Sequence, residues 1–102
     1  MNNHFTGSFY FDKTVNGNLI GEFSNNGSDS IMTESATAKS NGSNFEGGYI
    51  STWFDIDLTM ADLTITKKGK KYLLEWTNTG KEDFTGEGFL SGDKLIGFYK
   101  KK

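Results

Sequence analysis

Residues 84–99 have the sequence of a complete β-hairpin, and this stretch constrains the fold more than any other feature of the chain. Its first part, FTGEGFL at residues 84–90, combines two phenylalanines with two glycines. The turn sequence Ser91-Gly92-Asp93 follows, and KLIGFY at residues 94–99 is a second run rich in apolar residues. Two such runs around a glycine-containing tight turn predict an antiparallel pair of strands.

Looser copies of this hairpin recur along the chain. Residues 5–11 read FTGSFYF, and the turn sequence Asn16-Gly17 separates them from NLIGEF at residues 18–23. The words Phe-Thr-Gly and Leu-Ile-Gly therefore occur in the same order in both hairpins. A third, partial copy, FEGGYIS, covers residues 45–51. The recurrence indicates a chain built from short strands and turns.

Alternation of apolar and polar residues with period two predicts eight short strands, and no segment has a helical pattern of useful length. The strands are expected at residues 4–11, 18–24, 30–39, 45–54, 58–66, 71–77, 84–90 and 94–99. Residues 30–39 lack a strongly apolar face, which favours an edge-like or strongly bent strand.

Eight antiparallel strands can close into a barrel and so remove their exposed edges. We therefore predict an all-β fold, an eight-stranded antiparallel up-and-down β-barrel that residues 1–102 form as a single domain. A two-sheet β-sandwich is the alternative, because local alternation is the same in both folds.

Composition restricts the kinds of partner. Hydrophobic residues make up 34% of the chain and aromatic residues 15%, so the core must consist mainly of aromatic side chains. The net charge is −2 and every basic residue is lysine. Without arginine the chain lacks the side chain best suited to bidentate contacts with phosphate or guanine, which disfavours nucleic acid as a partner.

Cysteine is absent, which excludes disulfides and thiolate metal sites. No apolar run approaches the roughly 20 residues that a membrane span needs. Residues 1–4 lack the basic and apolar regions of a signal peptide. We expect a cytoplasmic protein from the sequence as written, or a secreted or periplasmic one if a signal peptide has been trimmed.

The sequence offers little for catalysis or metal binding. His4 is the only histidine, and the serines lack a Gly-x-Ser-x-Gly setting. Asp55, Asp57 and Asp62 lack the glycine and terminal glutamate of an EF-hand loop. We therefore expect no enzymatic activity, no catalytic residues, no bound metal and no cofactor.

Two sets of aromatic and aliphatic residues are candidates for binding. The first set shares the predicted inward face, where it either fills the core or lines a ligand pocket; it comprises Tyr49, Trp53, Tyr72, Trp76, Phe84 and Tyr99. The second set falls on the opposite faces and would form an apolar surface that a monomer rarely exposes; it comprises Phe54, Leu73, Phe89, Ile96 and Phe98.

Gly7-Ser8-Phe9-Tyr10 resembles the Gly-x-aromatic opening strand of the calycin barrels, the group of lipocalins, fatty-acid-binding proteins and avidins. The stretches that resemble small bacterial lipocalin-like domains are residues 61–66, 72–76, 84–89 and 95–99. The resemblance implies a barrel with a small hydrophobic ligand in its mouth. The chain is shorter than typical members, and Phe9 stands where lipocalins have tryptophan. The avidin ligand set cannot be matched, so biotin binding is not implied.

Two functions follow as hypotheses. In the first, the chain is a lipocalin-like binding protein that takes a small hydrophobic ligand between its inward aromatic residues. In the second, the barrel is solid, and its outward apolar face forms a homodimer or an inhibitor-type contact with another protein. Short strands around so many aromatic side chains favour the second hypothesis, while the aromatic inward face favours the first.

Overall fold

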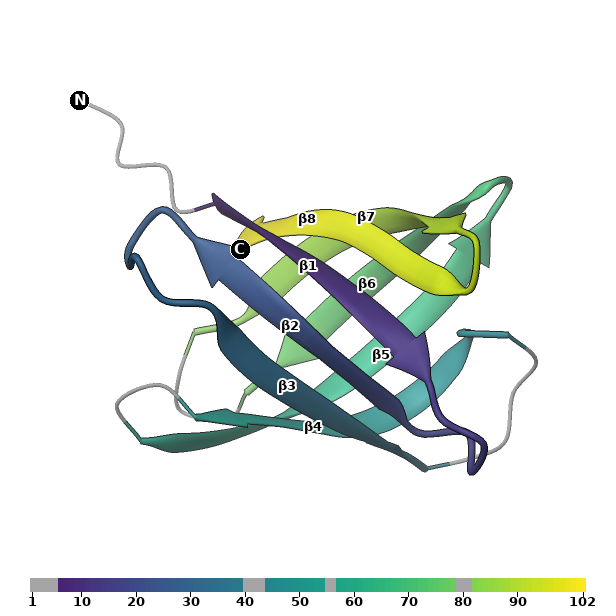
Figure 1. Cartoon of the computed structure of the whole chain (residues 1–102), viewed down its shortest axis with the longest axis horizontal. Helices are drawn as coiled ribbons and strands as arrows, with labels where there is room; N and C mark the ends of the chain where they lie inside the picture. The colour runs from purple at the N-terminus through teal and green to yellow at the C-terminus, as the bar shows by residue number, and fades with distance from the viewer. Residues whose placement is uncertain (1–5, 40–43, 55–56, 79–81) are drawn as a thin grey trace.

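The computed structural model describes residues 6–39, 44–54, 57–78 and 82–102. The strands are β1 (Thr6–Lys13), β2 (Leu19–Asn25), β3 (Met32–Ala38), β4 (Gly47–Phe54), β5 (Leu58–Lys68), β6 (Lys71–Thr77), β7 (Phe84–Ser91) and β8 (Lys94–Lys101). Each strand pairs antiparallel with the next, and β8 returns to pair with β1, so the sheet closes into a barrel (Figure 1). The predicted eight-stranded up-and-down barrel is confirmed, and the sandwich alternative is wrong.

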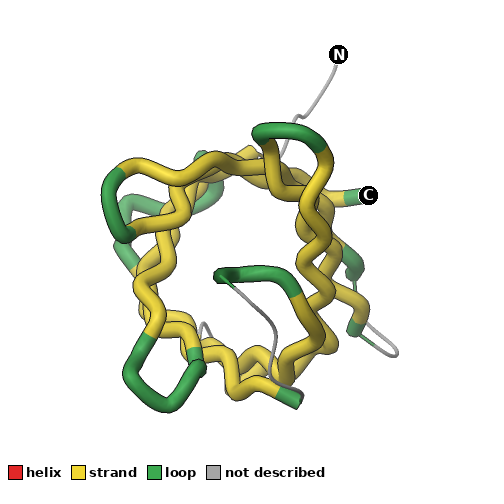
Figure 2. Tube along the Cα trace, turned by 90° about the vertical axis from the view of Figure 1, so that its right-hand side faces the viewer, coloured by secondary structure: helices red, strands yellow, loops and turns green. Residues whose placement is uncertain are grey.

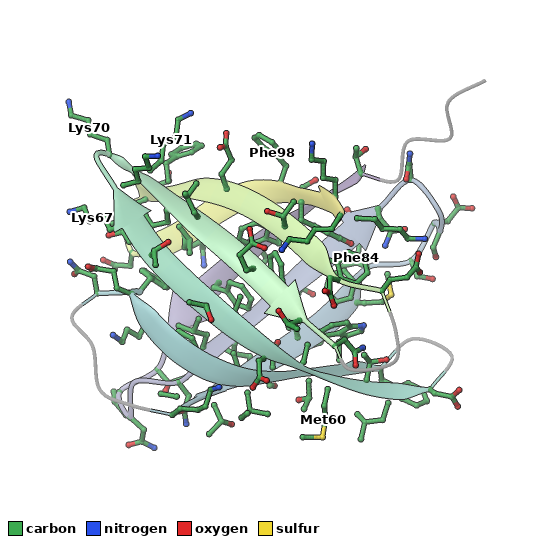
Figure 3. The ribbon with its side chains drawn as sticks, turned by 180° about the vertical axis from the view of Figure 1, so that it is seen from behind. Met60, Lys67, Lys70, Lys71, Phe84 and Phe98 are labelled. Atoms are coloured by element: carbon green, nitrogen blue, oxygen red, sulfur yellow. The ribbon has the colours of Figure 1, made fainter. Side chains whose placement is uncertain are left out.

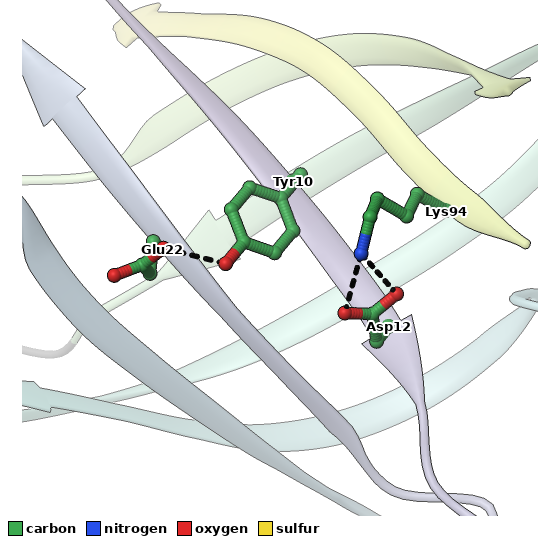
Figure 4. Close-up of polar contacts among 4 residues, drawn as sticks. All are labelled: Tyr10, Asp12, Glu22 and Lys94. Carbon is green, nitrogen blue, oxygen red and sulfur yellow. Dashed lines mark hydrogen bonds and ion pairs between the residues drawn. The ribbon is translucent and has the colours of Figure 1, made fainter.

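The seam between β8 and β1 closes the barrel. The two strands pair from Thr6 with Lys100 to Asp12 with Lys94. On the outer surface, Lys94 Nζ lies 2.9 Å from both carboxylate oxygens of Asp12, and the Tyr10 hydroxyl donates to Glu22 on β2 at 2.5 Å (Figure 4). Exposed polar contacts of this kind stabilise a fold only slightly. The backbone pairing between β1 and β8 therefore contributes most of the stability that keeps the barrel closed.

Alternation along the strands sends one set of side chains into the barrel. The buried apolar residues are Phe9, Phe11, Leu19, Ala36, Phe45, Tyr49, Ala61, Leu63, Ile65, Tyr72, Leu74, Trp76, Leu95 and Tyr99. The burial of Tyr72, Leu74 and Trp76 confirms the inward face predicted for residues 71–77. The burial of Ala61, Leu63 and Ile65 follows the period-two alternation expected for residues 58–66.

Residues 30–39 were predicted to form an edge-like or strongly bent strand, and the edge-like alternative is wrong. β3 pairs with β2 on one side and with β4 on the other, because barrel closure leaves no edge. Its inward residues include Ala36 and Ala38, which are small because aromatic rings from other strands already fill the interior. The weak apolar pattern of β3 thus reflects crowding inside the barrel.

One end of the barrel is closed by the loop before β4. Phe45 precedes the strand but is only 5% exposed, and its ring centroid lies 6.4 Å from that of Tyr72. The Tyr49 hydroxyl donates to the Phe45 carbonyl oxygen at 2.8 Å and fixes the loop in place. Figure 2, which looks along the barrel, shows a loop segment crossing its opening. The barrel is therefore plugged at the end where β4 begins.

The outer surface carries both lysines and apolar side chains. Lys67, Lys70 and Lys71 extend from the β5–β6 hairpin, and Phe98 points outward from β8 (Figure 3). Phe98 is 60% exposed. The described residues contain no helix, and hence none that is long and apolar enough to cross a membrane.

Candidate functional site

A pocket opens at the barrel end opposite the Phe45 plug. It forms where β1, β3 and β7 begin and where β2, β4, β6 and β8 end. Its volume is about 70 Å³, and its lining residues are Phe9, Phe23, Asn25, Glu34, Trp53, Trp76, Phe84 and Tyr99. Cavities that enclose a benzene ring measure about 150 Å³. The pocket therefore has room for one end of a small molecule or for a compact head group.

Six aromatic rings form most of the pocket wall. Ring centroids of neighbouring pairs lie 5.8 to 6.3 Å apart, including Phe9 with Trp76, Phe23 with Trp53, and Trp53 with Phe84. Most of these pairs meet at steep angles, for example 82° between Phe9 and Trp76. Edge-to-face contacts of this type stabilise the folded state by more than the burial of apolar area alone. The wall is therefore a connected aromatic cluster.

Glu34 places a carboxyl group among these rings. The register sets it between Gly21 on β2 and Trp53 on β4, and its side chain enters the barrel because it shares the inward face of β3 with Ala36. The residue is only 5% exposed. A charged residue at such a depth requires specific partners.

Two donors from neighbouring strands hold the Glu34 carboxyl group. Trp76 Nε1 donates to Oε2 at 2.8 Å, and the Ser51 hydroxyl donates a short hydrogen bond to the same oxygen. Burial raises the pKa of Glu34 to about 7, although these two hydrogen bonds act in the opposite direction. No described residue donates to Oε1. Glu34 can therefore present either a carboxylate oxygen or a hydroxyl donor near neutral pH.

Asn25 and Tyr99 form the polar part of the rim. The Asn25 side-chain amide donates to the Tyr99 hydroxyl oxygen at 3.1 Å, and Asn25 Oδ1 accepts from the Gly27 backbone N–H at 2.9 Å. The contact ties the end of β2 to the end of β8. It orients both side chains at the mouth without adding a charge to the pocket.

The predicted ligand-binding residues divide between the pocket and the core. Trp53, Trp76, Phe84 and Tyr99 line the pocket. Tyr49 and Tyr72 lie in the core beside the Phe45 plug and do not reach the pocket. The Tyr72 hydroxyl is buried and has no hydrogen-bond partner among the described residues. Its place in the core is consistent with the alternative in which these aromatic residues fill the interior.

Four lining residues were not among the predicted site residues. Phe9 and Phe23 lie within the strands predicted at residues 4–11 and 18–24 but were not assigned to a pocket, and Asn25 follows the second of these predicted strands, whereas the structure includes it in β2. Glu34 carries the site's only carboxyl group. The available signal was its spacing from Ala36 and Ala38, because residues two apart along a strand lie on the same face of the sheet. The small size of those alanines hid that face.

The predicted interface residues form two separate surfaces. Leu73, Phe89, Ile96 and Phe98 lie on the three adjacent strands β6 to β8, where Phe89 pairs with Ile96 and Glu87 separates Leu73 from Phe98. Phe54 is 63% exposed but pairs with Leu58 near the β4–β5 connection, on another part of the barrel. We call the β6–β8 set the outer apolar surface.

The candidate metal-ligating side chains do not cluster in the part of the chain that the structure describes. No group of three histidine, cysteine, aspartate or glutamate side chains there is arranged to hold a metal ion. His4 and Asp55 lie outside the described residues. Asp62 forms an ion pair with Lys39 at 2.9 Å.

No protein-family model matches this chain, and no curated protein and no solved structure is significantly similar to it. The barrel architecture is consistent with a calycin-like fold. The pocket and the outer apolar surface are therefore the features of the molecule from which a function can be inferred.

Proposed function

We propose that this chain is a non-enzymatic binding protein that takes a small, largely hydrophobic ligand at the open end of its barrel. The observation that carries the proposal is the pocket itself, where six aromatic rings surround a single buried carboxyl group. Pockets for small molecules are typically apolar with few, well-placed polar groups. The resemblance to calycin barrels supports a ligand in the barrel mouth.

Truncation of the pocket wall is expected to abolish most ligand binding. Trp53→Ala removes a partly buried ring at the mouth, and we expect it to weaken binding of 3,3-dimethyl-1-butanol, whose branched end is smaller than a benzene ring, at least tenfold, as loss of a central aromatic contact commonly does. Isothermal titration calorimetry measures the affinity. Tyr72→Phe is the matched control, because its ring is remote from the pocket. Equal affinity in the wild type and Trp53→Ala would disprove the pocket assignment.

Native mass spectrometry of the purified protein supplies a second, independent measurement. A bound molecule lost on denaturation would identify the natural ligand directly. The same spectrum reports whether the protein is a monomer or a dimer.

The outer apolar surface supports a second candidate function, contact with a second copy of the chain. Phe89 and Phe98 are 56% and 60% exposed, and Ile96, which pairs with Phe89, lies on the same surface. Exposed apolar patches of this kind commonly mark interaction sites. The chain would then be a homodimer, or a protein-binding module, with a nearly solid barrel.

If this surface forms a dimer, Phe98→Ser is expected to shift the protein to the monomer. The polar side chain removes apolar area from the contact, and a tenfold or greater rise in the dimer dissociation constant should follow. Sedimentation equilibrium measures the mass. Phe54→Ser, on the other exposed patch, should leave the dimer unchanged. An unaltered mass for Phe98→Ser would remove this surface from the interface.

A further inference from the structure

The charge of the pocket restricts which head group it can accept. Glu34 is the only carboxylate among the eight lining residues, and none of them is a base. The chain also contains no arginine. An anionic head group, such as the carboxylate of a fatty acid, would find no opposite charge in the lining and would face Glu34. A neutral or cationic group fits this lining better.

The hydrogen bonds of Glu34 leave its second oxygen to the ligand. Ser51 and Trp76 both donate to Oε2, and Oε1 receives no hydrogen bond from the described residues. Two donors fall short of the full solvation that a buried carboxylate needs. A cation placed in the pocket would supply the missing opposite charge, and its attraction to the carboxylate would be strong because the surroundings are apolar.

The aromatic wall selects among cations. The faces of tryptophan, tyrosine and phenylalanine rings attract cations, and quaternary ammonium groups are commonly recognised by several rings at once. A primary ammonium group has three N–H donors to satisfy, whereas the pocket offers Oε1 as its clearest free acceptor. A quaternary ammonium group has no N–H donors. Its apolar methyl surface suits a wall of six rings.

We infer that the pocket is selective for the methylated ammonium group of a small organic cation, which the Glu34 carboxylate pairs with and the surrounding aromatic rings enclose. The inference rests on the proposed function of the open-end pocket and specifies its ligand class. The head group would occupy the 70 Å³ pocket, and the remainder of the ligand would extend through the mouth.

A pair of probes that differ in charge but hardly in shape tests the inference. Choline and 3,3-dimethyl-1-butanol have nearly the same form, but a quaternary nitrogen in the first replaces a carbon atom in the second. At pH 8 we expect choline to bind at least tenfold more tightly by isothermal titration calorimetry. Equal affinities, or tighter binding of the alcohol, would overturn the inference while leaving the proposed pocket intact. Failure of both probes to bind would overturn both.

The pH dependence of choline binding gives a second test. The pocket receives Phe9, Phe23, Asn25, Trp53, Trp76, Phe84 and Tyr99 from β1, β2, β4, β6, β7 and β8, and Tyr99 is the only one of these that titrates. Because Glu34 must be ionised to pair with the cation, and its pKa is raised to about 7, choline affinity should fall about tenfold from pH 8 to pH 6. Affinity for the alcohol should stay constant.

Glu34→Gln separates the charge from the shape of the pocket. The amide retains an acceptor for Ser51 and Trp76 but cannot ionise. We expect it to lose the preference for choline and the pH dependence while still binding 3,3-dimethyl-1-butanol. Trp53→Ala should weaken the binding of both probes. A Glu34→Gln protein that keeps the full preference for choline would show that the carboxylate is not the recognition element.

Discussion

Glu34→Gln is expected to raise the free energy of unfolding at pH 8 by about 3 kcal/mol. Burial raises the pKa of Glu34 from 4.5 to about 7, which corresponds to roughly 3 kcal/mol of unfavourable ionisation in the folded state. The glutamine side chain keeps the shape of the carboxyl group and can accept the hydrogen bonds from Ser51 and Trp76, but it never carries a charge. For a domain of this size the gain corresponds to a rise in Tm of roughly 10 °C or more.

The sign of the pH dependence follows from the two protonation states. Below pH 4.5 Glu34 is protonated in both the folded and the unfolded chain and has no effect. Between pH 4.5 and about 7 the unfolded chain loses the proton while the folded protein keeps it, so stability falls as the pH rises. Above pH 7 both states are ionised and the loss, about 3 kcal/mol, is complete.

Urea unfolding of the wild type and the variant at pH 5 and pH 8 measures this effect. The difference between the two proteins should be small at pH 5 and should grow toward pH 8. Comparison with the variant removes the contributions of other carboxylates. Glu87→Gln is the matched control, because Glu87 forms only an exposed pair with Lys71 and its loss should change stability by less than about 0.5 kcal/mol. A constant difference between wild type and Glu34→Gln would show that Glu34 is not a buried, uncompensated acid.

The strands were predictable because their signal is local. Period-two alternation places Leu63 and Ile65, or Tyr72 and Trp76, on the inward face whatever the strands pair with, and the structure buries all four. The count of eight strands and the turn sequences then favoured a barrel. The start of β4 was less accurate, because Phe45 has the apolar character of an inward strand residue but reaches the core from a loop.

The location of the pocket depended on contacts that alternation does not contain. Tyr49 and Tyr72 have the same pattern as Trp53 and Trp76, but the Phe45 plug fills one end of the barrel and leaves the pocket at the other. The sequence has no local sign of which end is plugged. The separation of Phe54 from the outer apolar surface likewise follows from the register around the barrel.

Glu34 shows how a residue of the candidate site can have only a weak local signal. Alternation alone could not distinguish the faces of β3, because Ala36 and Ala38 carry too little apolar area to mark one of them. Its cross-strand partner Gly21 is on β2 and lies opposite Glu34 only once the sheet has formed. The proximity of two such residues follows from the register of the sheet and cannot be read from the sequence of either strand alone.

Gly21→Ala is expected to destabilise the protein by about 3 kcal/mol or more, a large fraction of the roughly 5 to 15 kcal/mol that a domain of this size has. A Cβ atom at Gly21 would overlap the backbone carbonyl oxygen of Tyr10, and the ring of Phe11 lies 3.0 Å away. Because a carbonyl in a paired strand cannot rotate aside, the whole β1–β2 ladder must shift. The shift would also move Glu34, the cross-strand neighbour of Gly21.

Gly48→Ala is the matched control for this substitution. Gly48 also lies within a strand, but the nearest atom to an added Cβ is the flexible Lys39 side chain at 3.5 Å, which is ordinary contact. Its effect on the free energy of unfolding should stay within about 1 kcal/mol, because only the backbone preference of the residue changes. Urea unfolding of both variants, with circular dichroism to report the sheet, measures the difference. Similar losses in the two variants would mean that β1 and β2 are not packed as closely at Gly21 as the structure places them.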